Sequence, residues 1–200
     1  MYHEEARTFE DLIPHISARV PKADEMSIEH IARQATIDFM EDTRIFHDQV
    51  VFTGQRGVVD YILEIPDDQV MIDILPEGVT LNGNAYRAFR RDGQYQVVGL
   101  TQTAVDGGCY AVNYSYKLKP DACELPDILY DNYLTAIVNK AVTLLFTGDK
   151  DGYVSGASFQ IAKQQYDSAV DTILARKLHN FSNGRPRMMR RSKRGHNNGF

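Results

Sequence analysis

Cysteine is scarce in this chain of 200 residues, which contains only Cys109 and Cys123. The two are not spaced as CxxC and have no paired histidines beside them, which argues against a disulfide framework and a structural zinc site. No apolar run reaches the roughly 18 residues that a membrane-spanning helix needs. The polar, acidic start of the chain, Met1–Glu5, does not resemble a secretion signal. We therefore expect a globular protein that is made in the cytoplasm and does not associate with membranes.

Acidic residues are missing from the end of the chain, because Asp171 is the last of them. The final 29 residues carry eight lysines or arginines, whereas the preceding 171 residues carry 14 basic and 27 acidic ones. The charge is thus divided between an acidic body and a basic tail. This division concerns binding partners rather than the fold.

Recognisable catalytic and ligand-binding patterns are also absent. The six histidines are scattered without HxxxH or HxH spacing, and no GxGxxG, GxxxxGK[ST] or GxSxG sequence occurs. The adjacent pairs Asp67–Asp68 and Glu41–Asp42 place their carboxylates on different faces, so we interpret them as solvated surface groups. We expect no catalytic residue, no cofactor and no metal, and hence a protein that is not an enzyme.

Helical periodicity is found at both ends of the chain. A short segment over Phe9–Ile16, which contains Pro14, predicts one or two helical turns. An amphipathic helix is expected to begin with Asp24 or Ser27 as its N-cap and to end near Ile45. A third helix opens at Leu125-Pro126-Asp127 and closes at Gly148, and a fourth follows the loop 149–155. Small residues on the last two helices favour their close packing: Ala136, Ala141, Ala162 and Ala169.

Between about Val50 and Leu118 the pattern changes to short segments rich in β-branched and aromatic residues. Strands are predicted at 58–65, 69–75, 95–98 and 109–118, and tight turns at Asn82-Gly83, Asp92-Gly93 and Asp106-Gly107-Gly108. In the last strand, Tyr110, Tyr114 and Tyr116 lie on one face. These tyrosines could stack on nucleobases, but we expect them to pack in the core.

These patterns predict an α+β fold. It consists of a helical bundle, made of an N-terminal helix and a C-terminal helical hairpin, with an inserted antiparallel β-sheet or small sandwich of five to seven strands. A single domain is expected over 1–180, with helices over 9–48, the β insertion over 50–119 and the hairpin over 125–179. Residues 181–200 have no periodicity and are expected to form a basic extended C-terminal arm.

The arm allows two functional interpretations besides a solvated terminus. Its basic residues could neutralise nucleic-acid phosphates, or they could bind an acidic protein surface while the methionine pair fills an apolar groove. The residues concerned are Arg185, Arg187, Met188, Met189, Arg190, Arg191, Lys193 and Arg194.

The order of elements resembles the head-to-tail adaptor, or connector, proteins of tailed bacteriophages. The resemblance rests on Asp11–Pro21, on Ile28–Phe39 followed by Thr43-Arg44, and on Leu125–Tyr130 with the apolar helix to Leu145. It continues from Ala157-Ser-Phe159 to Ala175-Arg176-Lys177 and covers nearly the whole layout of the chain. One departure is the loop at Tyr153–Ala157, where related chains often carry an aromatic residue and Asp-Pro.

This resemblance implies a structural protein of the virion neck. Such a protein forms a ring, in twelve copies, beneath the portal protein, extends the channel through which double-stranded DNA passes, and offers a platform to a tail or nozzle protein. The portal-binding candidates are the residues of the arm named above. Binding of nucleic acid by the arm is the alternative function, and peptidoglycan hydrolysis is a third, because some adaptors of short-tailed phages are linked to it.

The acidic body suggests a lining for the DNA channel, because a channel that passes DNA should repel its phosphates. The candidates lie in the β insertion and are Asp67, Asp68, Asp73 and Glu77. An insertion that faces outward instead is an equally open alternative.

Overall fold

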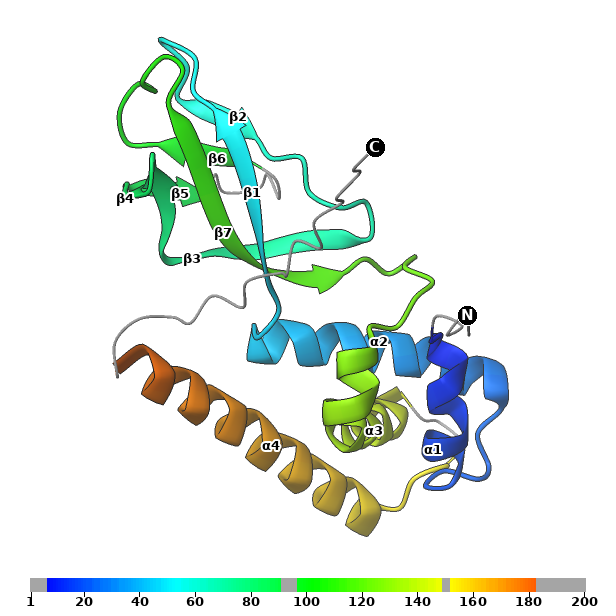
Figure 1. Ribbon diagram of the computed structural model, residues 1–200. Coiled ribbons are helices and arrows are strands. Elements are labelled where there is room, and N and C mark those ends of the chain that lie inside the picture. The colour runs from blue at the N-terminus through cyan, green and yellow to red at the C-terminus, as the bar shows by residue number, and fades with distance from the viewer. Residues whose placement is uncertain (1–6, 91–96, 149–151, 183–200) are drawn as a thin grey trace, which may run out of the picture.

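Helices from the two ends of the chain pack together, and strands form the segment between them (Figure 1). The structure, a computed structural model, describes residues 7–90, 97–148 and 152–182. The helices are η1 (Phe9–Leu12), α1 (Ile13–Ser17), α2 (Glu25–Thr43), α3 (Asp127–Gly148) and α4 (Gly156–Ser182). The strands are β1 (His47–Thr53), β2 (Asp60–Ile62), β3 (Gln69–Leu81), β4 (Asn84–Ala85), β5 (Ala88–Arg90), β6 (Val97–Leu100) and β7 (Cys109–Leu118). We call these two parts the helical unit and the β unit.

Helix α2 begins and ends close to where the sequence predicts. The Asp24 side chain accepts a hydrogen bond of 2.9 Å from the amide of Ser27, which makes Asp24 the N-cap. The helix ends at Thr43, and Arg44 follows with a left-handed φ of 48°. Its amide still bonds to the carbonyl of Met40, so the last turn is closed. The chain then passes directly into β1 (Figure 1).

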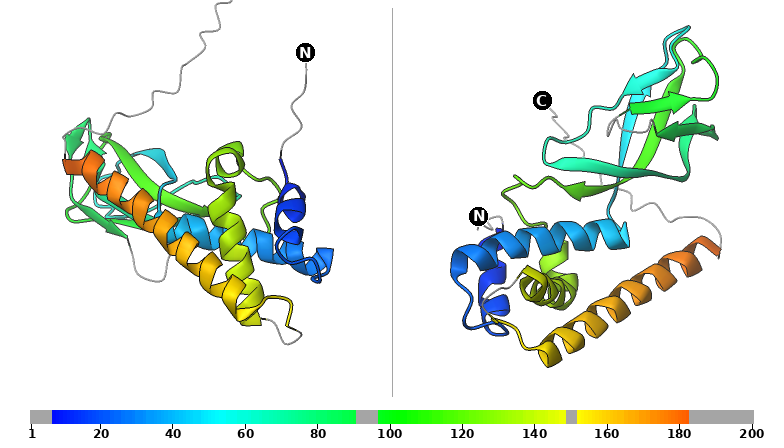
Figure 2. Two further views of the ribbon diagram at one scale, coloured as in Figure 1. Left: turned by 90° about the horizontal axis from the view of Figure 1, so that it is seen from below. Right: turned by 180° about the vertical axis from the view of Figure 1, so that it is seen from behind.

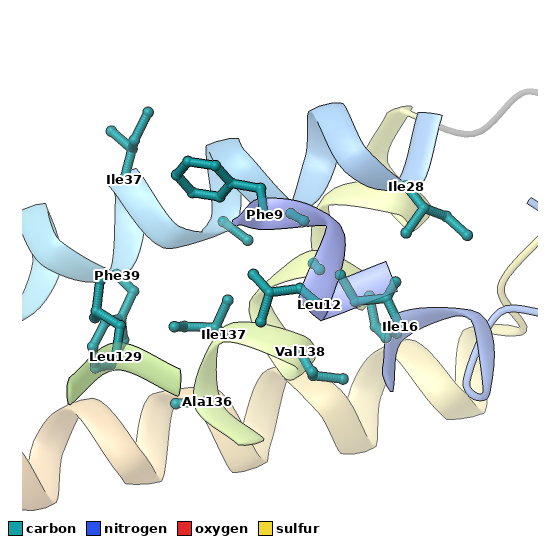
Figure 3. Packing of buried hydrophobic residues seen from close by; sticks show 14 of the residues in the cluster. Phe9, Leu12, Ile16, Ile28, Ile37, Phe39, Leu129, Ala136, Ile137 and Val138 are labelled. Carbon is teal, nitrogen blue, oxygen red and sulfur yellow. The ribbon is translucent and has the colours of Figure 1, made fainter. Parts of the chain in front are cut away.

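One hydrophobic cluster joins all parts of the helical unit (Figure 3). Phe9, Leu12 and Ile16 of η1 and α1 meet Phe39 of α2 and Ile137 of α3, and all five side chains are buried. Helix α4 adds fewer buried residues, chiefly Ala162 and Tyr166. Small side chains occur where α3 and α4 pack, as expected: Ala136, Ala141 and Ala162 are buried and Ala169 is partly buried. None of the residues 169–177 of α4 is fully buried.

The β unit consists of two antiparallel sheets, with strand orders β1-β7-β3-β4 and β2-β6-β5. Strand β7 occupies the range that the sequence predicts and pairs with both β1 and β3. Tyr110, Val112, Tyr114 and Leu118 are buried, and the two sheets share a second hydrophobic cluster. Because Tyr110 and Tyr114 are fully covered, the stacking of nucleobases on them is ruled out. The prediction that the tyrosines pack in the core is confirmed for Tyr110 and Tyr114, whereas Tyr116 is only partly buried and packs against both hydrophobic clusters.

Two strand predictions were wrong in extent. The strand expected over 58–65 is a regular strand, β2, only at Asp60–Ile62, although Val58 and Val59 also accept backbone hydrogen bonds and Leu63 and Ile65 are buried. Pro66, which has no amide hydrogen to donate, follows directly. The strand expected to end at Leu75 instead continues to Leu81, because a register shift between Ile74 and Val79 accommodates the intervening residues.

The predicted turn at Asn82-Gly83 joins β3 to β4. Both residues have positive φ, 49° and 84°, as a two-residue hairpin turn of this kind requires. The Asp106-Gly107-Gly108 turn precedes β7, and Gly107 also has positive φ. The third predicted turn, at Asp92-Gly93, lies outside the described residues. So do the first two residues of the strand expected at 95–98, whose last two residues begin β6.

Candidate functional site

The residues predicted to bind a portal protein lie outside the described part of the chain, since α4 ends at Ser182. These are Arg185, Arg187, Met188, Met189, Arg190, Arg191, Lys193 and Arg194. The structure does show where the preceding helix is held. The Lys177 ammonium donates a hydrogen bond of 2.8 Å to the carbonyl oxygen of Arg44, at the point where α2 passes into β1. This bond ties α4 to the joint between the helical and β units, five residues before the helix ends at Ser182.

This joint brings several charged groups together. The Arg44 carbonyl also accepts a hydrogen bond from His47 Nε2, at 2.8 Å, and the Arg44 guanidinium lies 3.3 Å from Asp73. Partial burial of the ring, and then the Lys177 charge, lower the pKa of His47 below its ordinary value. Partial burial, and then the Arg44 charge, likewise lower the pKa of Lys177. The joint therefore favours a neutral His47 beside two cations.

The four acidic candidates for a channel lining follow one another along the start of β3. Asp67 and Asp68 are exposed in the turn before the strand. Asp73 and Glu77 lie on β3 itself, and the ion pair with Arg44 partly neutralises Asp73. At about 3.3 Å per residue, these positions are distributed over roughly 30 Å rather than gathered in one cluster. Asp67 and Asp68 are thus the strongest of the four as a repulsive surface.

A polar cluster under α4 connects it to α2 and α3. The Tyr166 hydroxyl donates a hydrogen bond of 2.6 Å to Asp42, and the Lys140 ammonium lies 3.3 Å from Asp42 and 3.4 Å from Asp38. Burial of the ring, and then the hydrogen bond to Asp42, raise the pKa of Tyr166. Every member has a partner, so we interpret the cluster as structural.

Glu41 and Asp42 are both exposed, as the interpretation of solvated surface groups expects, and each also has a cation as a partner. Asp42 belongs to the polar cluster, and Glu41 lies 2.5 Å from the Lys117 ammonium of β7. Both carboxylates connect α2 to other elements, because Glu41 pairs with Lys117 of β7 and Asp42 pairs with Lys140 of α3. Their partners lie on strands and helices whose packing the local sequence does not reveal.

A groove of about 790 Å³ runs between α3 and α4 and reaches the end of α1. Seen from below, α3 lies between α1 and α4 (Figure 2). The apolar part of the lining includes Ala136, Ala169 and Ile161, the last of which is 53% exposed. Arg19 and Arg176 are the cations of the lining. Neither forms an ion pair with any carboxylate of the described residues.

Asn139 on α3 distinguishes this groove from an ordinary surface hollow. Its side chain is only 1% exposed, lines the groove, and has an Oδ1 atom without a hydrogen-bond partner in the structure. A buried acceptor left unpaired costs about 1 to 3 kcal/mol, and buried polar atoms of folded proteins almost always have a partner. The groove therefore has an unsatisfied acceptor, two unpaired cations and an apolar surface. No pattern in the sequence predicts it, because its residues come from α3, α4 and the turn after α1.

Other kinds of site receive no support from the described residues. No three His, Cys, Asp or Glu side chains among them lie close enough to hold a metal ion. Cys109 and Cys123 are both exposed free thiols. None of the helices in the described ranges is both long and apolar enough to cross a membrane.

Comparison with known proteins does not identify the chain, because no protein-family model matches it and no curated protein is significantly similar to it.

Proposed function

We propose that this protein is a structural component of a bacteriophage virion, a head-to-tail adaptor that is not an enzyme. In this proposal, copies of the chain form a ring that binds the portal protein, extends the DNA channel and provides the platform for a tail or nozzle protein. The supporting observation is the arrangement of the two segments that resemble adaptors. They are separated by the whole β unit in sequence and yet share one hydrophobic core. A helical bundle interrupted by a β insertion is the layout expected of the family.

The charge distribution supports the same proposal. The acidic body suits a wall that passes DNA without holding it, and Asp67 and Asp68 are exposed on the β unit. The basic arm suits an acidic surface on the portal protein, because arginine forms paired hydrogen bonds with carboxylates.

The direct experiment is to mix the purified full-length chain with assembled portal rings and to image the product by electron microscopy. The proposal expects an additional ring on one end of the portal. It also expects the chain in purified virions, at the neck, by mass spectrometry and cryo-EM. Portals that stay bare, together with virions that lack the chain, would overturn it.

Binding of DNA by the arm is the second candidate, because eight basic residues at the end of the chain are not balanced by a single acidic one. About six phosphate contacts predict that log affinity falls with log salt at a slope near −5. Titration of duplex DNA at several salt concentrations tests this. Strong binding that disappears when 183–200 are removed would favour this function over portal docking.

Peptidoglycan hydrolysis is the weaker alternative. It needs two carboxylates across a cleft, roughly 5 to 10 Å apart, one of which acts as an acid. Asp38 and Asp42 are already engaged by Lys140 and Tyr166. Zymography with the purified chain tests this alternative, and a clear band of cell-wall digestion would favour it over an adaptor.

A further inference from the structure

The first turn of α2 forms an exposed tip of the helical unit, on the side opposite the C-terminal half of α4 (Figures 1 and 2). Met26 at this tip is 82% exposed, which is unusual for a long apolar side chain. It lies beside Glu25, which is exposed and forms no ion pair with a described residue. The tip thus combines an apolar side chain with an unpaired carboxylate.

The tip also carries a free hydrogen-bond donor. The first intrahelical bond of α2 runs from the amide of Ile28 to the carbonyl of Asp24, and the amide of Ser27 bonds to the Asp24 side chain. Glu25 lies before both Ser27 and Ile28 in the chain, and the first amides of a helix have no carbonyl partner within the helix. It is therefore available to an outside acceptor.

These features match those of the groove between α3 and α4 one for one. The groove has an apolar wall around Ile161, unpaired cations at Arg19 and Arg176, and the buried unpaired acceptor of Asn139. We propose that the groove binds the first turn of α2 of a second copy of this chain. Met26 packs on the apolar wall, Glu25 pairs with Arg176 or Arg19, and a backbone amide of the turn donates to Asn139.

The positive charge of the groove argues against the basic tail of the chain as its occupant. The arm carries arginines and would bring them against Arg19 and Arg176, so like charges would meet. Lys22 lies two residues before the N-cap of α2, next to the tip. Asp167 and Asp171 of α4 lie just beyond the groove, beside the groove residues Gln164, Ser168 and Thr172, and can pair with this lysine.

This contact joins two different surfaces, so each copy offers a tip to one neighbour and a groove to the other. Such head-to-tail contacts build a closed ring when the rotation between copies closes. The inference rests on the proposed ring-forming function and names the contact between its subunits. It also explains why an isolated chain leaves Met26 and Asn139 without partners.

Charge reversal tests the contact. Glu25→Arg and Arg176→Glu should each weaken self-association of the full chain about tenfold or more, and the double variant should recover part of the loss. The measurement is sedimentation velocity over a range of concentrations, with circular dichroism to show that each variant is folded. Glu64→Arg and Arg56→Glu, which change exposed charges in the β unit, are the matched controls and should have no effect. Equal association of all variants would refute the contact.

A designed disulfide gives a second readout that does not depend on affinity. With Cys109 and Cys123 replaced by serine, Met26→Cys combined with Ile161→Cys should form a ladder of cross-linked oligomers on oxidation. Either substitution alone should give dimers at most. Absence of the ladder at high protein concentration would overturn the proposal. A second result would also overturn the proposal. If deletion of residues 1–6 makes the thiol of Ile161→Cys more reactive in the monomer, the N-terminal segment of the same chain is the occupant of the groove.

The two proposals can fail separately. Portal binding that persists with unchanged copy number in Arg176→Glu would leave the adaptor function standing and refute this contact. Oligomers that form through the cysteine pair but never bind a portal ring would support this contact and refute the adaptor function.

Discussion

Gly54 is a residue of the β unit that has no space for a side chain. A methyl group there would lie 2.6 Å from the Val105 carbonyl oxygen and 2.7 Å from the Tyr110 ring. The carbonyl belongs to the backbone and cannot turn away. We expect Gly54→Ala to lower the free energy of unfolding by about 1 to 3 kcal/mol, as overpacking does. Gly148→Ala, at the open end of α3, meets nothing within 4 Å and is the control that urea unfolding should find unchanged or slightly stabilised.

Tyr166 holds α4 against α2 through a single hydroxyl. Tyr166→Phe removes its hydrogen bond to Asp42, which is partly exposed and keeps Lys140 as a partner. We expect a loss of about 1 kcal/mol in the free energy of unfolding, and faster hydrogen exchange along α4. Tyr86→Phe is the comparison variant, because its hydroxyl lies in the β unit, where it forms a longer hydrogen bond of 3.4 Å to the Gln102 carbonyl and interacts with Tyr110. Equal losses of unfolding free energy in the two variants would show that the hydrogen bond to Asp42 stabilises the fold no more than the Tyr86 hydroxyl does.

His47 should make the stability of the fold depend on pH. Its pKa is lower in the folded chain, chiefly because the ring is partly buried, than the ordinary value of 6.5. As the pH falls below about 6.5, the unfolded chain takes up a proton first, so folding stability decreases until the folded-state pKa is reached. Denaturant unfolding at pH 7.5 and 5.5 should show a smaller loss for His47→Gln than for the unchanged chain. The same loss in both would contradict this assignment.

At the scale of elements, the sequence predicts well where local rules act alone. Asp24 and Pro126 mark the starts of α2 and α3, and strict alternation marks β7 over its whole length. The prediction fails at β2 and β3, where pairing partners decide. In the apolar run 58–65, only Asp60–Ile62 pair with a neighbouring strand, β6. In β3, a register shift lets the strand continue beyond Pro76. Non-local pairing of this kind leaves no trace in a window of a few residues.

The candidate sites show the same division between local and distant information. The basic arm and the adaptor-like segments can be read directly from the chain. The polar cluster joins Asp42 to Tyr166, and the groove combines Arg19 with Asn139 and Arg176. These residues are far apart in sequence and become neighbours only when the helices pack. Asn139 carries no sequence signal at all, because a polar residue in a helix is ordinarily exposed.

For the whole molecule, the acidic turn before β3 provides a test of the channel. If Asp67 and Asp68 face the lumen of a ring, Asp67→Lys combined with Asp68→Lys should attract DNA and slow or stall genome ejection, while rings still assemble. The measurement is the time course of DNA release from assembled particles. Asp106→Lys, an exposed change at another turn, serves as the control. Unchanged release with the doubly altered turn would place this face of the β unit outside the channel.

We propose that the basic arm attaches the molecule to its surroundings. Its 18 residues after Ser182 can extend over roughly 60 Å, at about 3.3 Å per residue, which is enough to leave one subunit and lie along another protein. The packing described for α4 lies before residue 183. We therefore expect removal of 183–200 to leave the melting temperature unchanged while abolishing attachment to portal rings in a pull-down experiment.

A second variant of the arm separates recognition of protein from binding of DNA. Replacing Arg185, Arg187, Arg190 and Arg191 by lysine keeps the charge but removes the planar fork that pairs with a carboxylate. Attachment to portal should weaken clearly, because it depends on these paired bonds. Affinity for DNA, which follows the number of charges, should change little. If portal attachment survives both truncation and the lysine substitutions, the docking surface lies within the folded body, and the acidic β unit becomes the next region to alter.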